Sequence, residues 1–535
     1  MKIADNAVRI IDKSLQRFDP IWRAQNGVGG QRDRYYDKTG VQKYREWRGL
    51  KDTMADYVSW LKILGYVGKM VAATPVHFVK GLLEYRWLGS YLSAFNFVDR
   101  LCEGYRGPEL EAAHIEMQGL VKGLTEMIAT LLKNDRRLGG SAGSDLILPY
   151  DKEMAPLWLK GFKELTPMPV QAITSFAICF MDQHIAPYYI DVSESFGIAP
   201  DVCSLCSGDL GVMLDDAEPI VGKALLSTNM ACNGNEARTG FAYYRSEVPT
   251  HMVTFAMQHN EEEALAYSMQ SIRDAMAFVE EQYGIRYDWE EFYTYAENMN
   301  EQTRIKHEKW EYYATPHSPV SGFTELLYMM FAWQLMNGTR FDFTTTDRKV
   351  LELCKKCYEE KHLQMDGRAR HRSLLWGPSS VYYADLSTWL RNCWGISCLF
   401  GLEGTMGIDH IDTSSPEAAL RDITRHTEKS VMRNVGVGGW DNIKSLFDWA
   451  FRFNCDMVLV FDNMSCKGMN GCHALIEEHG IELGFKFLYI HEDMYDHRTV
   501  SRQEIRNQIN EYMSVVLQEE PLDPTILEFD DSEAY

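Results

Sequence analysis

The feature that most constrains the fold is a strand, turn, helix, strand pattern near the C-terminus. The apolar run DMVLVFD at 456–462 is followed by a turn of Ser, Cys and Gly, by a helical stretch at 471–480, and by the apolar run FKFLYI at 485–490. Such a unit predicts two parallel strands joined by a helix, and parallel sheets bind ligands at the carboxyl ends of their strands. Cys466 lies directly after the first of these strands.

The rest of the chain reads as three further regions. Residues 1–150 show helical periodicity and predict a mainly helical N-terminal region, which ends near the Gly- and Ser-rich segment at 134–145. In 151–365, the runs VQAITSFAICF, KALLST and HMVTFAM predict strands, and long covering helices follow them. We therefore expect an α/β fold with parallel sheets in two domains, at 151–365 and 366–520. An acidic segment at 521–535 is interpreted as a solvated tail or a subunit-contact arm.

Charge and hydropathy exclude several classes of partner. The chain carries 54 Lys and Arg against 76 Asp and Glu, a formal charge of -22, which argues against nucleic acid and anionic membranes. Its first residues lack the features of a secretory signal, and no apolar stretch reaches the roughly 18 residues that cross a bilayer. We expect a cytoplasmic protein with no nucleic-acid or membrane partner.

Three of the twelve cysteines lie in turn-like stretches of Ser, Asn and Gly: Cys203, Cys232 and Cys466. An α/β chain can bring such strand-end turns to one point. Three thiolates meeting there would hold a metal ion or an iron–sulfur cluster with one position left open. These residues alone favour a zinc ion and an iron–sulfur cluster about equally.

The other cysteines carry weaker signals. Cys206 forms a CxxC with Cys203, a pattern that admits redox, zinc and incidental interpretations. Cys354 and Cys357 form a second CxxC in an amphipathic helix, and we favour a structural role for them. A zinc ribbon would need about 15–20 residues between the two pairs, whereas Cys206 and Cys354 are 148 positions apart (354 − 206). The remaining cysteines are interpreted as core residues, except that Cys472 could line the same cavity as Cys466 without binding: Cys102, Cys179, Cys393, Cys398, Cys455 and Cys472.

Two further patterns bear on nucleotide hydrolysis and on metal binding. No phosphate-binding loop of the G-x-x-x-x-G-K-[ST] type occurs, so the chain itself should not hydrolyse a nucleoside triphosphate. The stretch HEDMYDH at 491–497 has a spacing that could hold a hard metal, but we favour a solvated loop that caps the following helix.

The residues around the three cysteines carry a more specific signal than the cysteines alone. The stretches DVCSLCSGDLGVMLDDAEPIVGKALLSTNMACNGN at 201–235, LLWGPSSVYYADLSTWL at 374–390 and DMVLVFDNMSCKGMNG at 456–471 closely resemble the 2-hydroxyacyl-CoA dehydratase and benzoyl-CoA reductase family, and the resemblance runs from about 150 to 520. It implies two similar α/β domains of the Rossmann or flavodoxin type with a four-iron four-sulfur (4Fe-4S) cluster between them. By local match, its three cysteine ligands fall on Cys203, Cys232 and Cys466.

The resemblance also implies an activity. It points to a subunit of an acyl-CoA radical enzyme that dehydrates a 2-hydroxyacyl-CoA through a ketyl radical. The alternatives are a benzoyl-CoA-type reductase subunit and a non-catalytic electron-transfer or structural cluster subunit. The implied partners are an acyl-CoA substrate, a related second subunit and a separate ATP-hydrolysing iron–sulfur activator. Cys206 and Cys472 stand where the family need not have cysteine, which leaves a larger double-cubane-type cluster as the alternative cofactor.

Four residues are candidates for contact with the substrate or the cluster. Ser465 directly precedes the third cysteine, while Trp376, Gly377 and Pro378 follow a predicted strand where the family places a strand-end loop. A packed structural turn explains them equally well. The sequence does not single out a proton-transferring residue, because that choice needs geometry.

Overall fold

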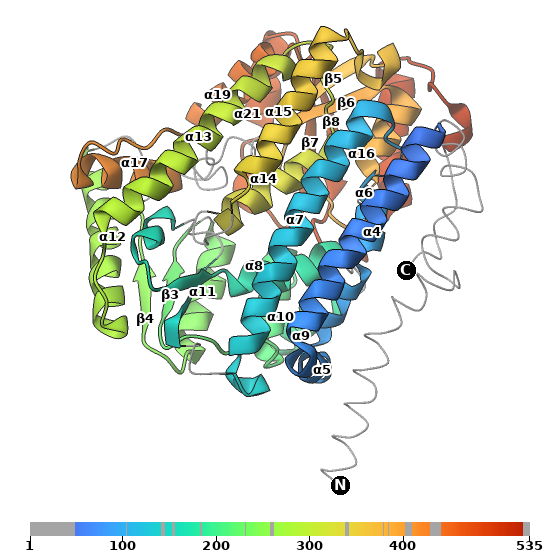
Figure 1. Cartoon of the computed structure of the whole chain (residues 1–535). Helices are drawn as coiled ribbons and strands as arrows, with labels where there is room; N and C mark the ends of the chain where they lie inside the picture. The colour runs from blue at the N-terminus through green and yellow to red at the C-terminus, as the bar shows by residue number, and fades with distance from the viewer. Residues whose placement is uncertain are drawn as a thin grey trace.

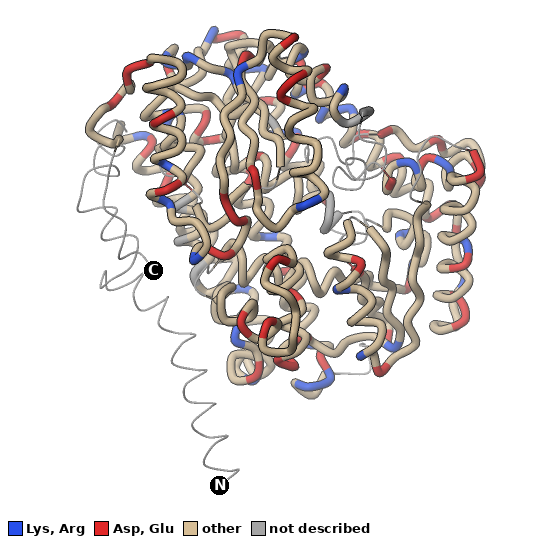
Figure 2. The backbone as a smooth tube through the Cα atoms, turned by 180° about the vertical axis from the view of Figure 1, so that it is seen from behind, with Lys and Arg blue, Asp and Glu red and all other residues tan. Residues whose placement is uncertain are grey.

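The computed structural model shows a mixed helix and sheet molecule with parallel strands and a helical N-terminal region, which confirms the predicted α/β fold (Figure 1). It describes residues 49–102, 104–140, 145–151, 156–181, 185–230, 232–256, 262–336, 342–377, 379–383, 385–401, 409–428 and 440–527. Seen from behind, acidic and basic residues are interspersed along the backbone (Figure 2), so the acidic excess is spread over the molecule.

Long helices form the N-terminal region. Helix α4 (Leu50–Ala73) packs along α7 (Gly107–Asn134), and α7 in turn packs against α14 (Phe323–Met336) and α15 (Thr344–Glu359) (Figure 1). The helical periodicity of the sequence predicted α4 and α7. Three short elements join α4 to α7: α5 (Pro75–Glu84), η1 (Arg86–Ser93) and α6 (Ala94–Cys102). The short η2 (Arg136–Leu138) follows α7.

The chain forms two parallel sheets, and the one later in the sequence, called the second sheet, contains four strands in the order β6-β5-β7-β8. They are β5 (His371–Trp376), β6 (Ile396–Gly401), β7 (Met457–Asn463) and β8 (Lys486–Glu492). Strands β7 and β8 pair in register from Met457 opposite Lys486 to Asn463 opposite Glu492. Helix α21 (His473–Glu482) lies between them in the chain, so the predicted strand, helix, strand unit is confirmed.

The first sheet is smaller but has the same strand order. It contains β1 (Ile147–Pro149), β2 (Thr166–Met168), β3 (Leu225–Thr228) and β4 (Thr250–Val253). β1 pairs with β2 and β3 pairs with β4, both in parallel, and a parallel bridge between Tyr150 and Leu226 joins the two pairs. The order β2-β1-β3-β4 therefore repeats the order β6-β5-β7-β8.

One predicted strand is wrong. VQAITSFAICF forms α8 (Val170–Ser175) and a π-helical continuation (Phe176–Met181), not a strand. Every residue of both segments is buried, so the run shows no periodicity that could separate a strand from a buried helix. Pro169, directly before Val170, is also a common residue at a helix start.

Further helices cover the sheets or join the strands. Among these, α12 (Glu262–Tyr283) and α13 (Trp289–Tyr313) confirm the long covering helices that the sequence predicted (Figure 1). The other helices are η5 (Leu157–Gly161), α9 (Ala186–Ser195), α10 (Ser204–Leu214), α11 (Asn233–Arg245), η7 (Gln364–Gly367), α16 (Leu386–Trp389), η8 (Leu390–Trp394), α17 (Pro416–Glu428), α19 (Trp440–Arg452), α20 (Lys467–Asn470), α22 (Arg502–Glu511), η10 (Tyr512–Val516) and η11 (Pro524–Ile526).

Part of the start of the acidic C-terminal segment packs against the rest of the chain. Ile526 is fully buried, its carbonyl accepts a hydrogen bond from the Trp389 indole at 2.8 Å, and the Leu522 amide donates to the Cys393 carbonyl at 2.7 Å. The apolar Leu522 and Ile526 within the acidic stretch explain this packing. Residues 528–535 lie outside the described part of the chain.

A buried charged group joins the long helices. Lys309 of α13 pairs with Glu325 of α14 at 2.6 Å, and the two side chains are 1% and 3% exposed. Glu116 of α7 and Asp347 of α15 are also fully buried beside this pair. Burial and the neighbouring Glu325 raise the pKa of Glu116 well above its ordinary value, which favours its neutral form.

Removing the lysine from this group should destabilise the fold. We expect Lys309→Met to lower the free energy of unfolding by about 3–5 kcal/mol, because Glu325 is left buried without its partner. Thermal and urea denaturation would measure the loss. The double variant Lys309→Met/Glu325→Leu removes both charges and should recover much of it. A single variant as stable as the wild type would contradict this account of the buried pair.

Candidate functional site

The three predicted ligand cysteines each precede the first turn of a helix. Cys203 is the N-cap residue of α10, Cys232 that of α11 and Cys466 that of α20. Cys232 follows the end of β3 and Cys466 follows the end of β7, the corresponding strand of the second sheet. Both therefore lie at the carboxyl end of the strand at which the connections change direction in this topology, where ligands bind in open α/β sheets.

The folded chain brings these cysteines together with a fourth. The Cys206 thiol hydrogen-bonds with the thiols of Cys203 and Cys232. An added Cβ on Gly234 would lie 3.2 Å from the Cys206 sulfur and 3.8 Å from the Cys232 sulfur, so the backbone of α11 passes close to both sulfurs. Cys466 interacts electrostatically with Cys203 and Cys232. Four thiols from distant parts of the sequence thus share one neighbourhood.

The helix N-termini give this neighbourhood its electrostatic character. The unpaired amides and the macrodipole at a helix N-terminus favour negative charge, and thiolates are the form of cysteine that binds metals. Burial raises the pKa of the Cys466 thiol to about 12, with a further contribution from Cys203. Hydrogen bonds that the Cys206 thiol donates to Cys203 and Cys232, together with burial, raise the pKa of Cys206 well above its ordinary value. Metal binding here would therefore release protons.

A buried carboxylate holds the helix that Cys232 begins. Asp151, directly after the bridge residue Tyr150, accepts hydrogen bonds from the Thr239 hydroxyl at 2.8 Å and from the Asn235 amide at 3.3 Å. Arg238 lies 3.5 Å from the same carboxylate, and all four of these side chains are almost fully buried. The carboxyl end of β1 thus fixes α11 and, with it, Cys232.

The turn that carries Cys466 is held in a comparable way. The Asn463 side chain accepts hydrogen bonds from the Ser465 amide at 3.1 Å and the Ser465 hydroxyl at 2.9 Å. The Cys466 amide donates to the Asn463 carbonyl at 2.9 Å. Lys467 forms an ion pair with Asp201, so the residue after Cys466 contacts the segment that leads to Cys203. Both side chains are exposed, and the pair adds little stability.

The tentative substrate residues take packed positions. Trp376 ends β5 and is fully buried, and the Ser465 hydroxyl is engaged by Asn463. Gly377 has a φ of +92°, and an added Cβ would lie 2.5 Å from the Phe461 carbonyl of β7, so the turn requires glycine. Pro378 lies outside the described residues. A role for these residues in substrate binding stays a prediction.

The stretch after β8 contradicts the solvated loop that we favoured. Glu492, Asp493 and Asp496 are 0%, 4% and 7% exposed, and the following helix is capped by Ser501, whose capping box with Glu504 does not involve them. Their position at the end of a strand that pairs with β7 explains the burial. The signal in the sequence for this burial was that the run continues directly from an apolar strand.

Glu492 is the functional candidate that the sequence did not single out. Its carboxyl accepts a hydrogen bond from the Ser380 hydroxyl, and its Oε1 has no hydrogen-bond partner among the described residues. Burial raises the pKa of Glu492 well above its ordinary value, and the carboxyl also interacts electrostatically with Cys203 and Cys466. A neutral carboxylic acid beside the thiols can hold a proton at the site.

Most of the other cysteines are buried, as the sequence suggested, whereas Cys455 and Cys472 are half-buried. Cys354 and Cys357 are buried in α15, and Cys472 is the half-buried N-cap residue of α21. Within the described ranges, no three His, Cys, Asp or Glu side chains converge closely enough to bind a single metal ion. The thiols of Cys203, Cys206, Cys232 and Cys466 are therefore neighbours rather than a closed single-ion site.

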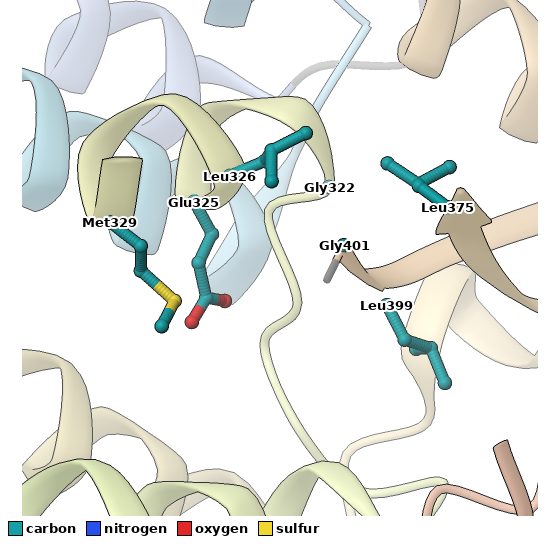
Figure 3. Close-up of a pocket in the computed structure, with 7 residues that line it drawn as sticks. All are labelled: Gly322, Glu325, Leu326, Met329, Leu375, Leu399 and Gly401. Atoms are coloured by element: carbon teal, nitrogen blue, oxygen red, sulfur yellow. The ribbon is translucent and has the colours of Figure 1, made fainter. Parts of the chain in front are cut away.

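A cavity elsewhere in the second sheet region is too small for a CoA thioester. It has a volume of about 10 Å³, close to the room that one water molecule needs. Glu325 and Met329 of α14 line one side, and Leu399 and Gly401 of β6 lie across from them (Figure 3). Of the buried Lys309 and Glu325 pair, Glu325 lines this cavity.

The raised pKa of Glu492 makes stability depend on pH. The folded chain keeps a proton that the unfolded chain loses above about pH 4.5, so this carboxyl costs stability as the pH rises. Glu492→Gln has no proton to lose. Its free energy of unfolding relative to the wild type should increase by up to about 1.4 kcal/mol per pH unit between about pH 5 and pH 7.

Urea denaturation at several pH values would measure this difference. Glu352→Gln, which changes an exposed glutamate of α15, is the matched control and should show no such trend. Parallel pH profiles for Glu492→Gln and the wild type would show that Glu492 is ionised in the folded chain.

Comparison with known proteins identifies the family. The family model described as 2-hydroxyglutaryl-CoA dehydratase, D-component (HGD-D), matches residues 166–515, and this span contains all four clustered cysteines and Glu492. No curated protein matches the chain. No helix in the described part of the chain is long and apolar enough to span a bilayer. The chain belongs to the 2-hydroxyglutaryl-CoA dehydratase D-component family and is a subunit of a 2-hydroxyacyl-CoA dehydratase-type enzyme.

Proposed function

We propose that this chain holds an iron–sulfur cluster with Cys203, Cys232 and Cys466 as ligands, and that it takes part in dehydrating a 2-hydroxyacyl-CoA. The observation that carries the proposal is that these three thiols, each at a helix N-terminus, share one neighbourhood, with Cys232 and Cys466 at corresponding strand ends of two sheets with the same order. Membership of the dehydratase family supports the substrate class.

The residues present suit such a cluster. Iron–sulfur clusters take cysteine thiolates as ligands, and the neighbourhood of Cys203, Cys232 and Cys466 supplies thiols from both sheets. The N-termini of α10 and α11 favour the negative charge that bound thiolates bring. Gly234 leaves space beside the sulfurs that any side chain would fill. A four-iron four-sulfur cluster is the proposed form, and a larger double-cubane-type cluster is the alternative.

The chemistry divides between the cofactor and the chain. When bound, a cluster with one iron free of protein thiolate supplies a Lewis acid and a one-electron donor for a thioester carbonyl. The chain's own residues fix the ligands and control protons. Asp151 holds α11 in place, and Asn463 shapes the turn that carries Cys466. The neutral carboxyl of Glu492 holds a proton beside the thiols, and a leaving hydroxyl that accepts a proton departs as water.

Two protein partners belong to the proposal. A D-component implies other subunits, and we infer a related second subunit of similar fold. The absence of a phosphate-binding loop from the sequence supports a separate ATP-hydrolysing iron–sulfur activator as the source of the electron. A cytoplasmic location stays a prediction.

Substitution of the ligands should remove the cluster. The wild-type chain, isolated without oxygen, should contain about four iron and four sulfide per chain. Cys203→Ser, Cys232→Ser and Cys466→Ser should each lose most of both, because a hydroxyl is a poor substitute for a thiolate. Chemical iron and sulfide analysis would measure the loss, and circular dichroism would check the fold. Cys455→Ser changes a half-buried cysteine outside the site and serves as the control. Full clusters in all three ligand variants would refute the assignment.

An acyl-CoA should change the cluster's spectrum. We expect 2-hydroxyglutaryl-CoA to alter the electron paramagnetic resonance spectrum of the chain in its complete enzyme, and turnover to require an ATP-dependent reductant. Mass spectrometry of the product distinguishes the reaction class, since dehydration loses one water and reduction gains two hydrogens. A spectrum that ignores the thioester would favour an electron-transfer or structural role for this chain.

A further inference from the structure

We propose that Cys206 is a fourth thiol ligand, so that the cluster of this chain is held by four cysteines until substrate arrives. This inference rests on the proposed function and extends it, because the three-ligand arrangement leaves one iron open. Cys206 would occupy that iron in the substrate-free chain, and an acyl-CoA thioester would have to displace it.

Contacts with two proposed ligands support this role. The Cys206 thiol hydrogen-bonds with the Cys203 and Cys232 thiols, so its sulfur lies on the side where theirs meet. The backbone of Gly234, in the first turn of α11, passes close to the same sulfur, and an added Cβ would lie 3.2 Å from it. The Cys206 sulfur therefore lies beside the sulfurs of two proposed ligands.

The surroundings of Cys206 differ from those of the other buried cysteines. Seven of the twelve cysteines are buried. Six of them pack within the apolar clusters of the core, and Cys206 does not: Cys102, Cys179, Cys354, Cys357, Cys393 and Cys398. Cys206 is 3% exposed, yet it interacts with two thiols and with the buried Arg238 guanidinium. A packing role explains the six and leaves Cys206 unexplained.

Helix geometry explains how Cys203 and Cys206 reach one point. Cys203 is the N-cap residue of α10, and Cys206 is the third residue inside that helix. Side chains at these two positions lie close together over the same helix end, as they do in a capping box. The CxxC spacing therefore presents two sulfurs at the N-terminus of α10, next to the sulfur that begins α11.

The test is resistance of the cluster to oxidation. Ferricyanide oxidation removes iron from a four-iron cluster most readily at a position without protein thiolate, which leaves a three-iron cluster with its own paramagnetic resonance signal. We expect the substrate-free wild-type chain, in its complete enzyme, to keep its iron under conditions in which Cys206→Ala loses one iron in about four and gains that signal. Before oxidation, both should contain equal iron. Cys472→Ala, which changes a half-buried cysteine at the N-cap of α21, should behave as the wild type.

The outcomes separate this inference from the proposed function. If the wild type and Cys206→Ala lose one iron at the same rate, Cys206 is not a ligand, although the three-cysteine cluster stands. If the wild type contains no cluster at all, the proposed function fails first. Cys206→Ser guards against a packing artefact, because the smaller change should give a stable chain whose cluster still converts faster than that of the wild type. Adding 2-hydroxyglutaryl-CoA to the wild type should make its cluster as sensitive as that of Cys206→Ala.

Discussion

In a parallel sheet every strand ends at the same edge, and the amides of the helices that follow begin there. This constraint places the functional groups of the present chain. Cys232 and Cys466 occupy corresponding positions after the third strand of each sheet, and the N-termini of α11 and α20 begin directly behind them. Cys203 reaches the same place from a turn before α10. Residues more than 260 positions apart (466 − 203) therefore meet without any local sequence relationship.

The polar groups at the strand ends are buried, so they need hydrogen-bond partners within the protein. At the first sheet, the Asp151 carboxylate accepts hydrogen bonds from Asn235 and Thr239 of α11. It also forms an ion pair with the buried guanidinium of Arg238. On the second sheet, Asn463 satisfies the Ser465 turn through its side chain. Hydrogen bonds among buried polar groups restrain the backbone segments that they join, although Asn463 Nδ2 and Arg238 Nε have no hydrogen-bond partner among the described residues. The cysteines are thereby held by networks that would remain in place if a sulfur changed its partner.

The sequence predicted the parts of this arrangement that depend on local pattern. The apolar run 456–462 and the turn after it located β7 and Cys466, and the Ser-, Asn- and Gly-rich flanks distinguished Cys203 and Cys232 from the core cysteines. The repeated strand order escaped detection because β1 and β2 are three residues long and each contains a proline. The nearness of Cys206 to Cys232 depends on long-range packing, which has no local signature. The burial of Glu492 had one local signal, the apolar strand that its run continues.

The charges around the thiols bear on how the proposed cluster would be reduced. An added electron brings negative charge into a buried place in a chain whose formal charge is -22. Glu492 is kept neutral by burial and adds no repulsion, while Arg238 and the helix N-termini offset part of the charge of the thiolates. A fourth thiolate from Cys206 would add one more negative charge and make reduction harder still. Displacing it with the neutral carbonyl of a thioester would ease the electron's entry, so substrate binding and reduction would favour each other.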